Sequence, residues 1–348
     1  MMLENKNSRT ELAELGEFGL IDHISRNILL KNESSVRGIG DDAAIIRSKG
    51  LTVVSTDMLV EGIHFDLAYV PLKHLGYKSV VVNVSDIYAM NATPRQITVS
   101  IALSNRFSLE AIEELYAGIQ MACDRYGVDL VGGDTTSSQH GFVISVTAVG
   151  EVEEGKQVYR NTANETDLIC VSGDLGAAYM GLQLLEREKK IFLENPEIQP
   201  DLGGNDYMLE RQLKPEARKD IIKGLGELQI IPTAMIDISD GLASELLHIC
   251  TSSGKGCSIY EDKIPIDTAT FNLARDFNLD PTLCALSGGE DYELLFTVSI
   301  SAYEKIKNMK DVSVIGHITE KAVGMNMITK SGSAVELQAQ GWDALRKK

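Results

Sequence analysis

The chain has 348 residues, which is longer than most single domains, so two domains of roughly 150 to 200 residues each are the first expectation. Apolar residues make up 44% and charged residues 24%, a composition that is typical of globular proteins and excludes a disordered or fibrous chain. Acidic residues number 50 against 33 basic ones, and the resulting charge of -17 argues against nucleic acid as a partner, because phosphate backbones bind basic surfaces.

The five cysteines are widely spaced and form no Cys-x-x-Cys pair, so neither a zinc site nor a redox motif is indicated. They are typical of reduced, buried thiols in a cytosol. No run of roughly 18 apolar residues is present to cross a membrane, and the first residues hold no apolar signal core. The sequence therefore predicts a soluble, cytoplasmic protein with no membrane partner.

The first half of the chain alternates between helical and strand patterns. Apolar residues at helical spacing and alternating β-branched segments predict, in chain order, a helix over 17–30, a strand over 51–56, a helix over 74–90, a strand over 97–103, a helix over 108–126 and a strand over 142–149. Helices that cover one sheet are expected to form an α/β domain of residues 1–152.

A polar linker over 151–167 leads into the second half, which repeats the alternation. The predicted elements are, in chain order, a strand over 168–173, a helix over 175–187, a polar loop over 194–206, a strand-to-helix unit over 233–250, and strands over 257–261 and 292–299. Residues 153–348 are therefore predicted to form a second α/β domain.

One local theme recurs, in which a strand-like run ends in small residues and then acids. It appears as GIGDD at 38–42, VGGDTT at 131–136, VSGD at 171–174 and LSGGED at 286–291. Glycine permits unusual backbone angles and lets a ligand come close to main-chain N–H groups. Each segment alone is also compatible with an ordinary solvated turn.

Several acids are candidates for metal binding, and each also has a structural interpretation. Taken alone, Asp41 and Asp42 are more typical of a solvated turn, and Asp57 follows Ser55 and Thr56 at what could simply be a strand end. Asp86 is flanked by apolar residues in a helical run, where an exposed helical acid is the alternative. Asp134 could instead cap a helix or turn.

The run TAMIDISDGL adds Asp237, Ser239 and Asp240 at the end of an apolar strand, where a helix cap is the alternative. Magnesium prefers hard oxygen ligands, takes few carboxylates per ion and uses nucleotide phosphates for the remainder. Strand-end acids at five separate places predict more than one ion. A divalent cation would also offset the repulsion between these carboxylates and a phosphorylated ligand.

Other nucleotide and metal signatures are absent from the sequence. It contains no G-x-x-x-x-G-K-[ST], no H-R-D with D-F-G, and no G-x-G-x-x-G that opens a helix. The D-x-S-D-G at 237–241 is not an EF-hand, because His248 stands where the loop requires glutamate.

Seven segments in the same order resemble the thiamine-monophosphate kinase family. They are GEFGLIDHI, GIGDDAAII, STDMLVEGIHF, VNVSDIYAMNATP, VGGDTTSS, IDISDGL and LSGGEDYELLF, and the match runs from about residue 16 to the end of the sequence. The main departure lies over 191–210, which we expect to be variable surface. The resemblance implies a two-domain α/β (α+β) fold like that of aminoimidazole ribonucleotide synthetase, with N-terminal sheets paired across a homodimer.

The resemblance also implies roles for individual residues. Magnesium would be bound by Asp42, Ser55, Thr56, Asp57, Asp86, Asp134, Asp237 and Asp240, of which Asp42, Asp86, Asp134 and Asp240 would be catalytic. ATP would contact Gly133, Asp134, Arg160 and Ser239. Thiamine monophosphate would contact His64, Glu290 and Trp342.

The chemistry of three of these side chains suits the implied ligands. Trp342 can stack on a cationic ring, His64 can hydrogen-bond phosphate, and Arg160 can clamp phosphate through two N–H groups. Ordinary alternatives remain for each: terminal packing for the tryptophan, a core position for the histidine and a solvated charge for the arginine.

The implied reaction converts ATP and thiamine monophosphate into ADP and thiamine diphosphate. The attacking oxygen is already an ionised phosphate, so positioning and metal ions should supply most of the acceleration, without a phosphoenzyme. Selenophosphate synthesis, aminoimidazole ribonucleotide synthesis and a hydrogenase-maturation role are rival activities of the same superfamily. The first expects a reactive cysteine near the N-terminus, where the first cysteine here is Cys123. A non-catalytic nucleotide- or metal-binding protein is the alternative outside enzymes.

Overall fold

The structure is a computed structural model that describes residues 10–39 and 43–339. The chain divides into two compact units. Unit 1 comprises Met1–Val84 and Pro94–Glu151, and unit 2 comprises Ser85–Thr93 and Val152–Lys348. The chain first passes from unit 1 to unit 2 between Val84 and Ser85, inside helix α2 (Leu72–Ala89).

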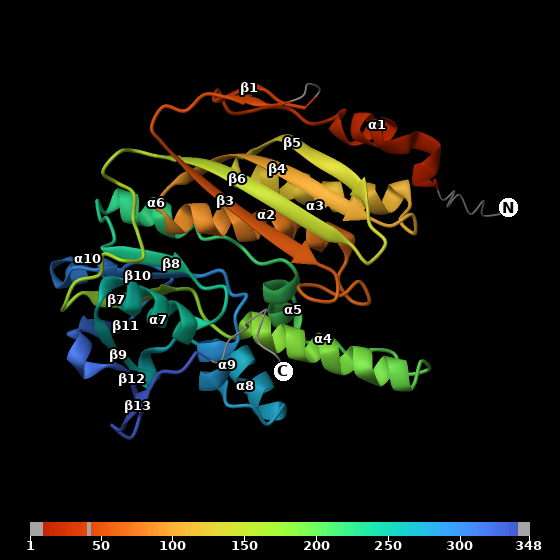
Figure 1. Cartoon of the computed structure of the whole chain (residues 1–348). Helices are drawn as coiled ribbons and strands as arrows, with labels where there is room; N and C mark the ends of the chain where they lie inside the picture. Colours follow the sequence, from red (N-terminus) through yellow and green to blue (C-terminus); the bar gives the residue numbers. More distant parts are fainter. Residues whose placement is uncertain (1–9, 40–42, 340–348) are drawn as a thin grey trace. The chain divides into compact units, whose positions relative to one another are not determined.

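Unit 1 is a four-stranded sheet with two long helices against one face (Figure 1). The strands lie in the order β3-β6-β4-β5, with bounds β3 Leu51–Val60, β4 Thr93–Leu103, β5 Asp129–Ser137 and β6 Val143–Val152. Strands β4 and β5 run parallel, and Ser100 lies opposite Asp134. The remaining elements of this unit are α1 Leu12–Ser25, β1 Ser35–Arg37, β2 Ile45–Ile46, the greater part of α2, and α3 Leu109–Tyr126.

The packing of unit 1 follows from periodicity in the sequence. In β6 every second residue is buried, as at Ile144, Val146 and Ala148, because successive side chains of a strand point to opposite faces. In α3 the residues predicted to face the core are buried, among them Ile112 and Ile119. Apolar residues of one sheet face and two helices therefore form the core of this unit.

Helices α2 and α3 come into backbone contact at a pair of glycines. A Cβ at Gly76 would lie 2.0 Å from the carbonyl oxygen of Leu115, and one at Gly118 would lie 1.9 Å from that of Lys73. No side chain fits at either position without moving a helix. The two glycines therefore set the distance between α2 and α3 in this part of the unit.

Unit 2 contains a seven-stranded mixed sheet with strand order β13-β12-β9-β11-β7-β10-β8. The strands are β7 Leu168–Ser172, β8 Ala234–Asp237, β9 Gly256–Tyr260, β10 Leu294–Val298, β11 Val312–Thr319, β12 Met325–Ile328 and β13 Ala334–Glu336. Strand pairs are antiparallel except β12 with β9, which is parallel.

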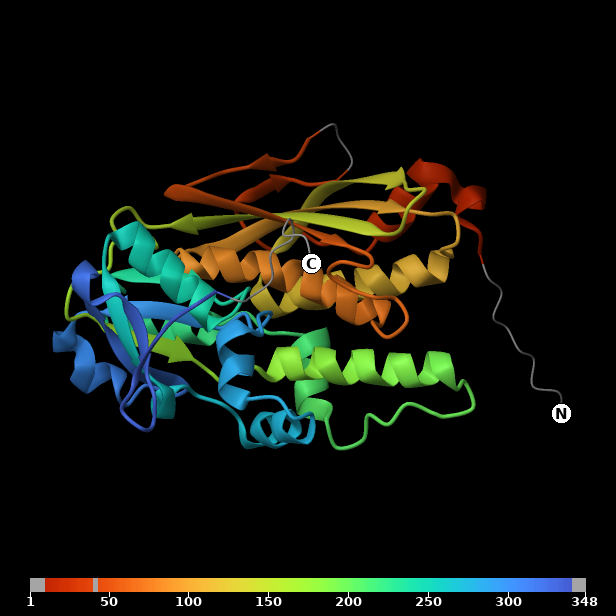
Figure 2. The same cartoon turned by 60° about the horizontal axis from the view of Figure 1, so that its bottom comes forward.

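Helices cover both faces of this sheet (Figure 2). The helices of unit 2 are α4 Ala177–Glu194, α5 Asp206–Leu213, α6 Lys219–Glu227, α7 Leu242–Ser253, α8 Thr268–Asp276, α9 Pro281–Ser287 and α10 Tyr303–Ile306, with three 3-10 turns at Glu261–Lys263, Ile300–Ala302 and Lys321–Val323. Helices α7 and α9 pack on one face of the sheet and α6 and α10 on the other, whereas α4, α5 and α8 form a separate apolar cluster with α9. In β7, Ile169 and Val171 pack in the cluster that contains α7, whereas Cys170 packs in the cluster that contains α6 and α10. Burial on both faces explains why residues 168–171, LICV, are all apolar.

The predicted α/β class and the alternation of strands and helices are confirmed. The predicted bounds differ from the observed ones at several elements. Helix α1 begins at Leu12 rather than at 17, and β10 begins at Leu294 rather than at 292 because Glu290 and Tyr292 have positive φ angles of 60° and 50°. Helices α5, α6, α8 and α9 were not predicted. Among the described residues, no helix is both long and apolar enough to cross a membrane.

The glycine contact predicts a large effect of one added methyl group. We expect Gly118→Ala to lower the free energy of unfolding by about 1 to 3 kcal/mol, because the helices must separate to accommodate the Cβ. Gly226→Ala is the matched control, since this glycine also lies in a helix but a Cβ there meets nothing within 4 Å. It should be neutral or stabilising by up to about 1 kcal/mol. Urea unfolding measures both, and equal effects would refute the close-contact argument.

Candidate functional site

The predicted site residues that the structure describes fall on both units. Unit 1 carries Ser55, Thr56, Asp57, His64, Gly133 and Asp134. Unit 2 carries Asp86, Arg160, Asp237, Ser239, Asp240 and Glu290. Asp42 and Trp342 lie outside the described residues, so their roles stay predictions.

The three predicted ligands in β3 do not share one face. Because side chains alternate along a strand, Ser55 and Asp57 point to one side of the sheet and Thr56 to the other. The hydroxyl of Thr56 accepts a hydrogen bond from that of Thr147 at 3.1 Å and donates to the carbonyl of Val146 at 3.1 Å. The backbone N–H of Asp57 donates to Oδ1 of Asn83, a fully buried residue of α2, at 3.0 Å. Asn83 therefore fixes the end of β3 that carries Asp57.

Gly133 and Asp134 lie inside strand β5. The interpretation of Asp134 as a helix or turn cap is therefore wrong, because its neighbours on both sides are paired with β4. A Cβ at Gly133 would lie 1.9 Å from the carbonyl oxygen of Val99, so only glycine fits this position. Asp134 itself is exposed, and its carboxylate is accessible to a ligand.

His64 closes the turn that follows β3. Its Nδ1 accepts a hydrogen bond from the backbone N–H of Val60 at 3.1 Å, and its own N–H donates to the carbonyl of Val60 at 2.9 Å. Because Nδ1 accepts, a neutral ring carries its proton on Nε2, which is then a donor. This arrangement is compatible with a hydrogen bond from Nε2 to a phosphate oxygen.

In unit 2, a hydrogen bond joins Asp237 to Ser85, the residue that precedes Asp86. Ser85, which is buried at the C-terminal part of α2, donates from Oγ to Oδ2 of Asp237 at 2.7 Å. Asp237 ends β8 and is only 6% exposed, and Asp86 directly follows the serine. This hydroxyl therefore joins the C-terminal part of α2 to the end of β8.

The loop after β8 is held by the segment that precedes β10. The N–H of Glu290 donates to the carbonyl of Ser239 at 2.7 Å, and the N–H of Tyr292 donates to that of Ile238 at 2.9 Å. Gly289 permits this contact, because a Cβ there would lie 2.6 Å from the carbonyl oxygen of Ser239. The residues predicted for ATP and for the acceptor are therefore joined backbone to backbone.

A buried glutamate of α7, which was not predicted, supports the same loop. Glu245 is 3% exposed, and its Oε1 accepts from the N–H of Asp240 at 3.0 Å. Burial raises the pKa of Glu245 to about 7, although the hydrogen bond from Asp240 and the charge of Arg160 oppose the rise. Arg160 is exposed and therefore available to an anionic ligand.

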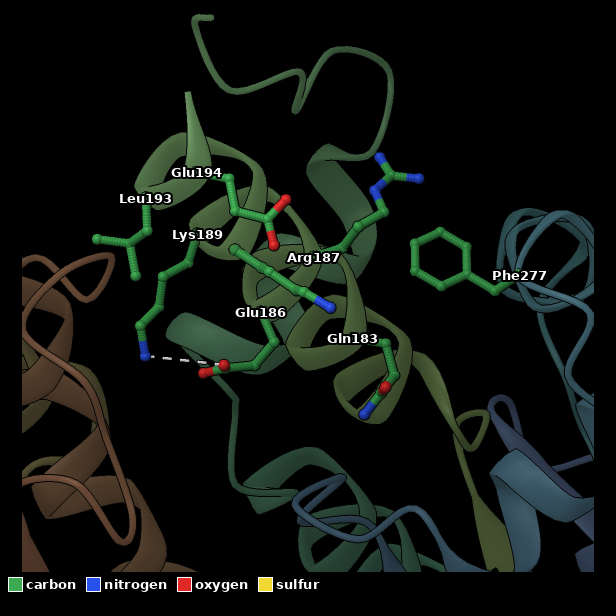
Figure 3. A pocket seen from close by; sticks show the side chains of 8 residues that line it. Gln183, Glu186, Arg187, Lys189, Leu193, Glu194 and Phe277 are labelled. Carbon is green, nitrogen blue, oxygen red and sulfur yellow. Dashed lines mark ion pairs between the residues drawn. The ribbon is translucent and has the colours of Figure 1, made fainter. Parts of the chain in front are cut away.

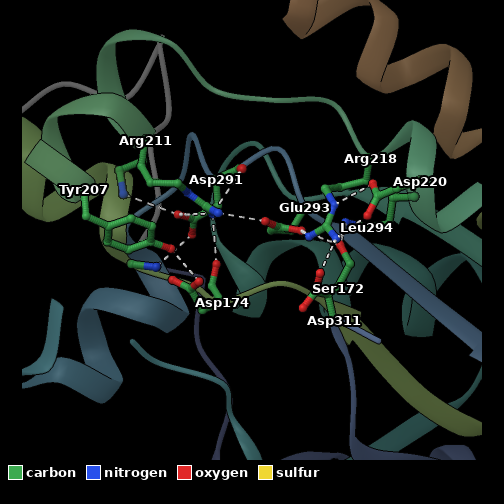
Figure 4. Close-up of polar contacts among 12 residues, drawn as sticks. Ser172, Asp174, Tyr207, Arg211, Arg218, Asp220, Asp291, Glu293, Leu294 and Asp311 are labelled. Carbon is green, nitrogen blue, oxygen red and sulfur yellow. Dashed lines mark hydrogen bonds and ion pairs between the residues drawn. The ribbon is translucent and has the colours of Figure 1, made fainter. Parts of the chain in front are cut away.

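A polar cluster surrounds the other end of the Gly288–Glu293 segment (Figure 4). Glu293, 1% exposed, accepts from Arg211 Nη1 at 2.9 Å, from Arg218 Nη1 at 2.6 Å and from Ser172 Oγ at 2.5 Å. Asp291, also 1% exposed, accepts from the N–H of Gly176 at 2.9 Å.

The pKa values in this cluster reflect burial and mutual pairing. Burial raises the pKa of Asp291 to about 7, and it also raises the pKa of Asp174. Burial opposes the charge of Arg211, but the neighbouring carboxylates, Glu293 first among them, hold its pKa above the usual value. The arginine is therefore a permanent cation that joins three acidic positions.

Within residues 10–39 and 43–339, no three His, Cys, Asp or Glu side chains gather closely enough to hold a metal ion. The magnesium ligand set stays a prediction.

A surface cavity of about 770 Å³ contains none of the predicted site residues (Figure 3). It is lined by Gln183, Glu186, Arg187, Lys189, Lys190, Leu193, Glu194 and Phe277. The guanidinium of Arg187 lies 4.7 Å from the centre of the Phe277 ring.

Comparison with known proteins identifies the family. Residues 40–152 match the family model "AIR synthase related protein, N-terminal domain". The chain is 38% identical over 325 residues to the thiamine-monophosphate kinase of Buchnera aphidicola subsp. Schizaphis graminum, which covers 90% of this chain and 94% of that protein.

Two solved structures are similar over nearly their whole length. The thiamine-monophosphate kinase from Stenotrophomonas maltophilia K279a superposes with a TM-score of 0.77 at 32% identity and covers 92% of this chain and 98% of its own. AaThiL complexed with AMPPCP and TMP superposes with a TM-score of 0.73 at 33% identity and covers 97% of this chain and 100% of its own. Since the identity exceeds 30% over nine tenths of the chain, this protein belongs to the thiamine-monophosphate kinase family.

Proposed function

We propose that this protein transfers the terminal phosphoryl group of ATP directly to thiamine monophosphate and so produces thiamine diphosphate. Family membership supports this activity, as does the similarity to AaThiL complexed with AMPPCP and TMP. The observation in this chain that carries the proposal is the backbone hydrogen bond of 2.7 Å from Glu290 to Ser239. It joins the residue proposed for the acceptor to the one proposed for the nucleotide.

The chemistry of the predicted ligands fits magnesium. Ser55 and Thr56 offer hydroxyl oxygens, and Asp57, Asp86, Asp134, Asp237 and Asp240 offer carboxylates, which are the hard donors that Mg²⁺ prefers. Asp237 is 6% exposed, and a charge that is so buried is costly unless a cation or strong donors lie nearby. When bound, magnesium neutralises the phosphate charges that these acids would otherwise repel.

The chain's own residues would bind and orient the substrates. Gly133, Arg160 and Ser239 are proposed to contact ATP, and Glu245 keeps the Asp240 turn in place through the N–H bond described above. His64 is proposed to donate from Nε2 to the acceptor phosphate. No general base is required, because the attacking phosphate oxygen is already ionised, and no side chain is expected to become phosphorylated.

The proposal extends to assembly and location. Residues 1–152 are proposed to bind nucleotide and metal and to form a homodimer, and residues 153–348 to complete the fold. Strand β3 supports the dimer, because it is an edge strand whose Val54 and Met58 are 62% and 55% exposed. The cytoplasm is the proposed location, in keeping with five cysteines that are all buried and free.

The activity itself is tested by measuring ADP release. Thiamine monophosphate should stimulate ADP release, whereas thiamine, selenide and buffer alone should not. Excess chelator should abolish turnover and added Mg²⁺ should restore it, because phosphate and carboxylate charges then lack a counter-ion. Turnover that persists in excess chelator would refute the magnesium dependence, and stimulation by selenide alone would refute the choice of acceptor.

The role of Asp134 is tested by Asp134→Asn, which removes one charge at an exposed position of β5. We expect kcat to fall by about 100-fold or more, as for the loss of one strong electrostatic contact to the transition state. The melting temperature should change little. Asp262→Asn is the matched control, because Asp262 is also exposed, has no proposed role in the site and forms an ion pair with Lys263 at 3.4 Å. A normal kcat with a lower melting temperature for Asp134→Asn would assign it a structural role instead.

The dimer is tested by light scattering at micromolar concentration, which should give about twice the 38.0 kDa of one chain. Replacing both Val54 and Met58 with glutamate should shift the species to a monomer, because charges on an edge strand oppose pairing. Val335→Glu is the control on an edge strand of the other sheet, where the side chain is 48% exposed. A wild-type monomer, or the same shift in the control, would contradict the proposed interface.

A further inference from the structure

Helix α5 presents a buried glutamine to the side chain of Glu290. Gln212 is 5% exposed, and its Nε2 donates to Oε2 of Glu290 at 2.8 Å. The backbone of Glu290 has a φ angle of 60°, a conformation that is uncommon for residues other than glycine and persists only where surrounding contacts impose it. The direction of the carboxylate is thus fixed by the backbone bond to Ser239 and by the amide of Gln212.

The helix that carries Gln212 is itself anchored by the preceding residue. Arg211 donates from Nη1 to Glu293 at 2.9 Å and from Nη2 to the carbonyl oxygen of Asp174 at 2.9 Å (Figure 4). Tyr207, one turn earlier, donates to Oδ2 of Asp174 at 2.5 Å. Charged hydrogen bonds of this kind are strong, so α5 has little freedom to move away from the segment that carries Glu290.

A glycine in α4 brings α5 within reach. A Cβ at Gly181 would lie 2.2 Å from the carbonyl oxygen of Met208 and 2.9 Å from the Cβ of Gln212. Met208 also packs with Met180 in the apolar cluster between these helices. The close approach at Gly181 sets the position of the Gln212 backbone. From that position the side-chain amide of Gln212 reaches Glu290 at hydrogen-bonding distance.

We infer that Gln212 is a positioning residue of the acceptor site, which aims the Glu290 carboxylate at the positively charged ring system of thiamine monophosphate. The inference rests on the proposed function. A neutral amide suits this task, because it orients Glu290 by a hydrogen bond and leaves its full negative charge for a cation. A lysine or arginine at position 212 would instead neutralise that charge.

The test is the steady-state kinetics of Gln212→Leu, which removes the donor at similar size. KM for thiamine monophosphate should rise on the order of tenfold, the usual effect of losing a hydrogen bond to a charged group, while KM for ATP and kcat stay nearly unchanged. Gln212→Asn keeps the amide on a shorter side chain and should give a smaller rise. It also serves as the second variant if the leucine variant does not fold.

A double-mutant cycle separates positioning from a general structural role. In a Glu290→Ala background, Gln212→Leu should have no further effect on KM for thiamine monophosphate, because the carboxylate that it orients is gone. Gln120→Leu is the matched control, since this glutamine of α3 also donates to a carboxylate, Asp124, at 3.0 Å, but lies in the other unit. It should leave all kinetic constants unchanged.

The inference is overturned if folded Gln212→Leu and Gln212→Asn keep the wild-type KM for thiamine monophosphate. It is also overturned if the rise is equal in the Glu290→Ala background, or if KM for ATP rises in step. A wild-type protein without activity toward thiamine monophosphate would instead refute the proposed function, so the two failures are distinguishable.

Discussion

The geometry of unit 2 depends on the hydrogen bonds that the carboxylate of Glu293 accepts. It is buried at the start of β10 and accepts from two guanidinium groups and the hydroxyl of Ser172, whose oxygen in turn accepts from the N–H of Leu294. Removing the acid would take its closest carboxylate from Arg211 and leave Arg218 paired with the more exposed Asp220, which is costly in a buried setting. Through Arg211 and Arg218 it holds α5 and the start of α6 against the sheet, and its own carbonyl accepts from the N–H of Ile238 at 2.7 Å.

Much of the fold could be predicted because the signals are local. The apolar stripe of α3 and the alternation in β6 each follow from a period that is visible in sequence. Helix α5 could not be predicted, since it is only eight residues long, half of them polar, and its stability comes from Arg211 and from packing against Gly181. The segment over 191–210, expected to be variable surface, is exposed at most positions and contains the end of α4 and the start of α5.

For the site, the sequence could indicate which residue types carry the chemistry but not which residues hold them in place. Asp237 and Glu290 stand in motifs with glycine and neighbouring acids, so the resemblance identified them. Gln212 and Glu245 have no such signal, and Ser85 stands in the VNVSDIYAMNATP segment without an indicated role. Each acts through a hydrogen bond to a residue whose position only the tertiary structure reveals. Supporting residues of this kind are found by burial and hydrogen-bond partners rather than by motif.

The reactivity of the five buried thiols can be used to measure local opening of the structure. Cys123 lies in unit 1 at 1% exposure, and Cys170, Cys250, Cys257 and Cys284 lie in unit 2 at 4% exposure or less. Burial raises the pKa of both Cys123 and Cys170 to about 12, so neither offers a thiolate to a reagent while its surroundings remain packed. The rate at which each is alkylated therefore follows the opening of its own unit, and the single cysteine of unit 1 lets the two openings be followed separately.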